Sequence, residues 1–166
     1  MTAIKNIVEG ESLSYIGLFK VKELYDLIEK WCYEMGYDHQ ELKNYQEHYD
    51  TGKQIIIEAR PFKLISDYAK IEIRIFMIFS EIKDVEVERD GIKEIYNKGK
   101  VDMIFDLFLV TDWENILQNR PLYYFLRTIF DKFIYKSYTR KFERKALSDY
   151  EDIKDKIKGY LNMYKY

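Results

Sequence analysis

The residues most capable of chemistry in this sequence are charged side chains, and the largest group of them is basic. Residues 120–145 contain eight Lys and Arg against Asp131 and Glu143, a net charge of +6 in a chain whose total charge is −2. Tyrosines are interleaved with the basic residues, a pattern typical of surfaces that pair with phosphates and stack on bases. The candidate binding residues of this run are Arg127, Lys132, Lys136, Arg140, Lys141, Arg144 and Lys145.

The basic run also has a simpler interpretation, in which it is the solvated face of a helix. Lys and Arg cover apolar surface with their stems while their charged ends stay in water. No nucleic-acid-binding motif accompanies the run, and the total charge of the chain does not favour nucleic acid. Both interpretations stay open, and nucleic acid is retained as one candidate partner.

A second group of charges is acidic. Residues 81–90 hold five Asp and Glu against Lys83 and Arg89, a net charge of −3. An acidic segment and a basic segment in one chain could pair head to tail between subunits, or pair within one subunit. Charges on an edge hairpin also prevent aggregation. The sequence does not decide among these three roles.

A third group lies at even positions of three predicted strands, where side chains share one face of the sheet. Next to it on the same face stand the apolar residues Phe76, Ile78 and Phe108. Charged groups beside apolar ones are typical of a ligand pocket. The alternative is a set of cross-strand ion pairs on an exposed half of the sheet. The charged members are Glu58, Arg60, Glu72, Arg74 and Asp106.

The sequence contains none of the common catalytic or metal-binding motifs. There is no Gly-rich phosphate loop, nucleophile elbow or zinc-protease motif. His39 and His48 match no zinc spacing, and Cys32 falls on an apolar helical stripe, where a thiol is inert. We therefore expect no metal, cofactor or catalytic residue. An enzyme without a recognisable motif stays open as an alternative, with the five charged sheet residues as its candidates.

The elements that position these groups follow from hydrophobic periodicity. Residues 18–35 show helical spacing, with Gly36 at the expected left-handed cap, and Asp90-Gly91 is a hairpin signal. A turn is also predicted at 97–99, and a capping box at Ser148 predicts the start of a final helix. The other predicted elements are strands at 45–49, 54–60, 69–82, 84–89, 92–96 and 100–111 and helices at 113–119 and 121–136.

These elements predict a single α+β domain over residues 1–166. The expected fold is an antiparallel meander of five or six strands, packed by an N-terminal helix and two or three C-terminal helices. Odd positions such as Ile73 and Phe105 are expected to form the core face. In a helix-grip variant of this fold, the curved sheet wraps a helix and leaves a cavity.

Composition indicates a globular protein of the cytoplasm. Hydrophobic residues make up 47% of the chain, and no run of about 18 apolar residues exists, so no transmembrane segment is expected. The chain has one cysteine, and its first ten residues lack the apolar stretch of a signal peptide. Three stretches, 31–37, 84–91 and 160–164, together resemble small uncharacterised archaeal proteins. That resemblance implies no activity, so no functional residue is assigned from it.

The leading hypothesis is a non-catalytic interaction protein that binds a macromolecule or a second copy of itself through the basic helix. The chain has 16 Tyr, and Tyr is favoured at interfaces because it has one apolar and one polar end. Tyr160, Tyr164 and Tyr166 are therefore candidate interface residues, although they could equally form a rim around the core. A small-ligand-binding protein that uses the mixed face of the sheet is the alternative.

Overall fold

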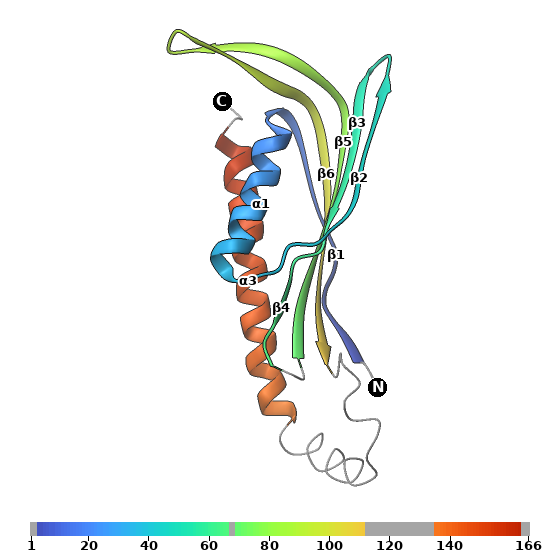
Figure 1. Ribbon diagram of the computed structural model, residues 1–166, viewed down its shortest axis with the longest axis vertical. Helices are drawn as coiled ribbons and strands as arrows, with labels where there is room; N and C mark the ends of the chain where they lie inside the picture. The colour runs from blue at the N-terminus through green and yellow to red at the C-terminus, as the bar shows by residue number, and fades with distance from the viewer. Residues whose placement is uncertain (1–2, 67–68, 112–134, 164–166) are drawn as a thin grey trace.

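The computed structural model describes residues 3–66, 69–111 and 135–163 (Figure 1). All strand pairs are antiparallel, and the sheet has the order β1-β6-β5-β3-β2, with β4 paired to β5 beside this path. An α+β class therefore describes the fold. The elements are β1 (Ala3–Phe19), α1 (Val21–Met35), β2 (Glu41–Tyr49), β3 (Gly52–Ala59), β4 (Phe62–Leu64), β5 (Ala69–Arg89), β6 (Ile92–Thr111) and α3 (Tyr135–Met163).

The first strand, β1, was not predicted, and it changes the topology from a simple meander. β1 pairs with the last strand, β6, from Ala3 opposite Thr111 to Phe19 opposite Asn97. Its apolar alternation is broken because the register shifts twice between Asn6 and Glu11. An edge strand needs no continuous apolar face, so its sequence carries little strand signal.

The two long strands β5 and β6 each replace two shorter predicted strands. The Asp90-Gly91 turn between them is confirmed, and both residues have positive φ, 52° and 79°. The turn predicted at 97–99 is wrong, because β6 runs straight through it. Gly99 instead lies opposite a bulge in β5 around Glu81, whose φ is 54°. A Cβ at Gly99 would come within 2.8 Å of the Ser80 carbonyl oxygen, so only glycine fits there.

The predicted core face is confirmed. Odd positions of β3, β5 and β6, among them Ile57, Ile73 and Phe105, are buried. Both described helices lie on this face of the sheet (Figure 1). Leu24, Ile28, Trp31 and Cys32 come from α1, and Tyr150, Ile153, Ile157 and Leu161 come from α3.

Helix α1 ends as predicted at Gly36, which has φ 72° and donates its N–H to the Tyr33 carbonyl. It begins at Val21 rather than at residue 18, because Leu18 and Phe19 still pair with β6. Two buried hydrogen-bond donors, one in α1 and one just after it, join this part of the chain to α3. Trp31 Nε1 donates to Asp152 at 2.8 Å, and the Tyr37 hydroxyl donates to Asp149 at 2.8 Å.

Helix α3 differs from the prediction at its start. It already includes Tyr135, so the capping box at Ser148 lies in its interior and the predicted helix start there is wrong. The half-buried Phe142 and the buried Ala146 extend the apolar stripe of Tyr150 toward the N-terminal end, which explains why the helix does not break at Ser148. The predicted helix 113–119 and nearly all of 121–136 lie outside the described residues. Two or three C-terminal helices were predicted, and the described residues contain one, α3. Neither of them is long and apolar enough to cross a bilayer.

Candidate functional site

The five charged residues predicted on the mixed sheet face lie together as one ion-pair cluster. Arg74 lies between two carboxylates, with Nε 2.9 Å from Glu58 Oε1 and Nη1 3.0 Å from Asp106 Oδ2. Arg60 Nε lies 3.1 Å from the same Glu58 oxygen, and its Nη1 lies 3.5 Å from Glu72. These residues come from β3, the connection after it, β5 and β6, so strand register assembles the cluster.

Burial and ion pairing have opposite effects on the pKa of Glu58, whose side chain belongs to a residue that is only 3% exposed. Burial raises the pKa of its carboxyl, but hydrogen bonds from Arg74 and Arg60 and their charges outweigh burial and hold the pKa below its usual range. Asp106 accepts a further hydrogen bond at 2.8 Å from the backbone N–H of Gly10 in β1. Each carboxylate of the cluster therefore has an arginine within 3.5 Å, an arrangement that holds strands together rather than one poised for proton transfer.

A shallow groove adjoins this cluster on the same face. It has a volume of about 530 Å³ and is lined by Leu42, Asn44, Tyr45, Ile56 and Phe76. The ring of Phe76 also contacts the cluster, because the Arg74 guanidinium carbon lies 5.0 Å from its centroid. The groove belongs to β2, β3 and β5 on the face away from the helices, whereas the sequence predicted a cavity between the sheet and the helices.

The basic run lies partly outside the described residues. Arg127 and Lys132 fall there, and Lys136 is described only as a backbone position in the first turn of α3. We name the remaining four, Arg140, Lys141, Arg144 and Lys145, the basic segment. All four are exposed. Lys145 lies 3.6 Å from Asp149, whereas Arg140, Lys141 and Arg144 have no ion pair with any residue that the structure describes.

The acidic run forms the tip of the β5–β6 hairpin, at the other end of the molecule. Glu86, Glu88 and Asp90 are exposed, and Glu86 makes a loose pair with Lys93 at 3.7 Å. Figure 1 shows the tip of this hairpin, residues 84–97, at the end where α1 begins and α3 ends, whereas the basic segment lies near the start of α3. The two charged regions therefore do not meet within one molecule.

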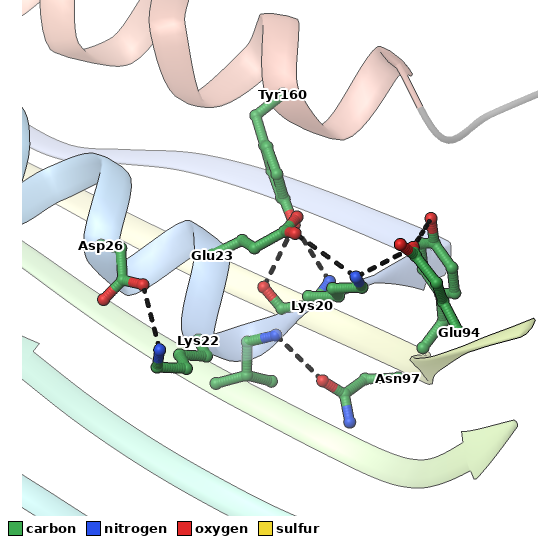
Figure 2. Close-up of polar contacts among 9 residues, drawn as sticks. Lys20, Lys22, Glu23, Asp26, Glu94, Asn97 and Tyr160 are labelled. Carbon is green, nitrogen blue, oxygen red and sulfur yellow. Dashed lines mark hydrogen bonds and ion pairs between the residues drawn. The ribbon is translucent and has the colours of Figure 1, made fainter. Parts of the chain in front are cut away.

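A polar network fixes the hairpin to both helices (Figure 2). The Tyr160 hydroxyl, from the last turns of α3, accepts the backbone N–H of Lys20 at 3.0 Å. The same hydroxyl lies 3.1 Å from the Lys20 carbonyl oxygen and 3.0 Å from Glu23, so its one proton serves one of these two acceptors at a time. Lys20 Nζ then reaches Glu94 of the hairpin at 3.1 Å, and this hydrogen bond, with the nearby carboxylates, raises the Lys20 pKa.

Asn97 completes this network at the start of α1. Its side-chain oxygen accepts the N–H of Val21 at 2.9 Å (Figure 2), and its side-chain nitrogen donates to Asp84 at 2.8 Å. Lys20 supplies no side-chain cap for α1, so Asn97 takes that role from another strand. Tyr160 is only 9% exposed, which favours the alternative that it belongs to the rim of the core, whereas Tyr164 and Tyr166 lie outside the described residues.

Sequence reasoning missed one exposed group entirely. Tyr45 and Tyr49 on β2 are 51% and 53% exposed, and both hydroxyls donate to Glu47 of the same strand. Their spacing of four, an even number, would have placed them on one face of a strand, but the short segment gave no sign of lying at the sheet edge. Comparisons of the chain with protein-family models, with curated proteins and with solved structures returned no match. The resemblance to archaeal proteins therefore stays a prediction.

Proposed function

We propose that this chain is a non-catalytic interaction protein that binds an acidic macromolecular surface through the basic segment of α3. The observation that supports this proposal is the state of Arg140, Lys141 and Arg144, which are exposed and lack an ion pair among the described residues. By contrast, Arg60 and Arg74 are both held by carboxylates. Unpaired cations keep their charge available to a partner, whereas paired ones do not.

The position of the segment on the helix supports the same proposal. Residues 136, 140 and 144 are four apart, so they share one face of α3. Between residues 140 and 144, Glu143 pairs with Lys5 of β1 at 2.5 Å. The one acidic residue among positions 140–145 is thus paired within the molecule, and it does not neutralise Arg140 or Arg144.

The acidic partner has two candidates. One is a polyanion such as a single-stranded nucleic acid, whose phosphates pair with Lys and Arg. The other is the acidic hairpin of a second copy, because the two charged regions lie at opposite ends of the chain (Figure 1). Head-to-tail pairing of this kind produces rings or open chains.

The test is a charge reversal of the segment, Arg140→Glu with Lys141→Glu and Arg144→Glu. Binding is measured as fluorescence anisotropy of a labelled 20-nucleotide single strand across a salt series, and self-association as sedimentation equilibrium. If phosphates are the partner, we expect weaker binding and a log–log salt slope that falls by roughly one for each lost contact. If the hairpin is the partner, reversal of Glu86 and Glu88 to Lys abolishes the same self-association.

Lys158→Glu is the matched control, since Lys158 is an exposed lysine farther along the same helix. A triple reversal that behaves like Lys158→Glu in both measurements would contradict the proposal. Far-UV circular dichroism of each variant distinguishes a lost contact from a lost fold.

A second candidate is a helix-grip-like protein that binds a small apolar ligand. It is favoured by the groove of about 530 Å³ beside the sheet-face cluster. Its test is the thermal unfolding midpoint with indole, a neutral aromatic compound, as probe, which suits the apolar side chains Leu42, Ile56 and Phe76 of the lining. The groove is supported if the probe raises the midpoint of the protein and Phe76→Ala removes that increase. Nothing in the described residues favours the enzymatic alternative, because the candidate carboxylates all have arginine partners.

A further inference from the structure

Strand β2 is an open edge of the sheet. Among the described strands it pairs with β3 alone, so one side of its backbone has N–H and C=O groups without strand partners. The other edge, β1, is protected by two register shifts and by α3, whose Lys154 bonds Glu11 of β1 at 2.6 Å. The helices contact β2 less: the Tyr25 hydroxyl of α1 donates to Glu41 at one end of the strand, whereas Leu42, Tyr45 and Tyr49 are exposed.

The sequence of β2 is complementary to itself in one antiparallel register. When a two-fold axis passes through Tyr45, residue 43 of one copy stands opposite residue 47 of the other, a lysine opposite a glutamate on both sides of the axis. The same register places Asn44 opposite Gln46, two amides able to hydrogen-bond each other. At the axis, the two Tyr45 rings form a cross-strand aromatic pair.

The neighbouring registers lack this match. An axis at Asn44 places Glu41 opposite Glu47, which is repulsive, and an axis at Gln46 leaves Glu47 opposite Tyr45 and pairs no opposite charges. A slip by a single residue would place unlike faces of the strand opposite each other, so those registers are excluded. Charge therefore selects the register centred on Tyr45.

We propose that two copies of this chain join edge to edge through β2, with the two-fold axis at Tyr45, into one continuous antiparallel sheet. Backbone hydrogen bonds provide the contact, and the opposite charges of the residue types at positions 43 and 47 select its register. The same contact would extend the groove beside Tyr45, because Leu42 and Tyr45 lie on the edge strand and also line the groove. The apolar lining of one copy then continues into that of the other.

The test is a charge swap measured by sedimentation equilibrium of the full chain. We expect Lys43→Glu alone and Glu47→Lys alone each to weaken the dimer by about tenfold or more, because two symmetry-related pairs change from attraction to repulsion. The double variant restores opposite charges at both pairs and is expected to return to within about threefold of the original dimer constant. Urea unfolding of each variant verifies that the monomer is still folded.

Amide hydrogen exchange gives a second readout, in which residues 43–49 gain protection as protein concentration rises. A chain that stays monomeric, or a double variant that fails to restore the dimer, overturns the inference. So does a dimer that is dissolved by the triple reversal of the basic segment and unaffected by Lys43→Glu. In that last case the proposed function is supported while the edge contact is rejected, so the two proposals fail separately.

Discussion

At the scale of single residues, the sheet-face cluster depends on Glu58, which serves two arginines at once. Removing one partner of a buried ion pair costs more than the pair contributes, because the remaining charge stays desolvated. Glu58 is nearly buried, whereas Arg74 and Arg60 are partly exposed. We therefore expect the loss of the Glu58 charge to destabilise the fold by less than the loss of one partner of a fully buried pair.

We predict that Glu58→Gln lowers the free energy of unfolding by about 2 kcal/mol at pH 7. Because the folded-state pKa of Glu58 is lowered, its contribution is present above the ordinary value of 4.5 and is lost as pH falls through the folded value. The difference in the free energy of unfolding between the protein and the variant should therefore shrink as pH falls below 4.5. Urea unfolding across this range measures it, with the exposed Glu86→Gln as control; a constant difference would show that the charge of Glu58 is not the cause.

Tyr160 gives a second residue-scale prediction, because its hydroxyl is the hydrogen-bond partner of the Lys20 backbone N–H. Tyr160→Phe leaves that donor without this bond at the start of α1, so we expect a loss of about 1–2 kcal/mol in the free energy of unfolding. Tyr33→Phe removes a hydroxyl from a side chain that is 88% exposed, and we expect it to change little. Equal effects of the two substitutions in thermal unfolding would contradict a structural role for the network in Figure 2.

At the scale of elements, two glycines of the chain should respond in opposite ways to the same substitution. Gly99 faces the bulge of β5, where an added Cβ would lie 2.6 Å from Ile82 Cδ1 and 2.8 Å from the Ser80 carbonyl oxygen. Gly159 lies on the exposed side of α3 with nothing within 4 Å of a new Cβ. We expect Gly99→Ala to destabilise by about 1–3 kcal/mol through overpacking, and Gly159→Ala to stabilise by up to about 1 kcal/mol through helix propensity.

Chemical denaturation of the two variants, measured side by side, tests this pair. The hairpin beyond the bulge should also exchange its amide hydrogens faster in Gly99→Ala, because the bend that places Glu94 near Lys20 is disturbed. Two glycine variants that shift stability in the same direction would show that the bulge geometry does not restrict residue 99.

The elements also show which parts of the fold were predictable. The core alternation of Ile73 and its neighbours and the end of α1 at Gly36 follow from local periodicity and backbone conformation, and both were predicted. The strand β1 was missed because bulges hide its alternation. Gly99 was read as a turn residue, although the reason for a glycine there is a close approach from β5, which no local pattern reveals.

At the scale of the whole molecule, the sheet-face cluster was predictable from the sequence, but the relative positions of the two charged regions were not. Strand parity brought Glu58, Arg74 and Asp106 together correctly, because neighbouring antiparallel strands keep their faces aligned. The separation of the basic segment from the acidic hairpin was not predictable. It depends on the length of α3, in which about 30 Å of helix lie between residue 140 and residue 160.

The two proposed contacts together predict how the chain assembles. Edge pairing through β2 closes a dimer, whereas contact between the basic segment and an acidic hairpin would extend it. Light scattering at about 50 mM salt should then show assemblies larger than a dimer, which are reduced to the dimer at about 500 mM because exposed charges are screened. Arg144→Glu should remove the large assemblies and leave the dimer, and assemblies that resist salt would contradict an electrostatic contact.

The single cysteine of this chain can report how often helix α1 opens. Cys32 is buried on the inner side of α1, and burial, with a smaller effect of nearby Glu29, raises its pKa to about 12, so its thiol is neutral and shielded in the folded protein. A thiol reagent can reach it only when α1 lifts from the sheet, because reaction requires the exposed thiolate. The labelling rate of the unmodified chain therefore reports how often this one helix opens, without any introduced probe.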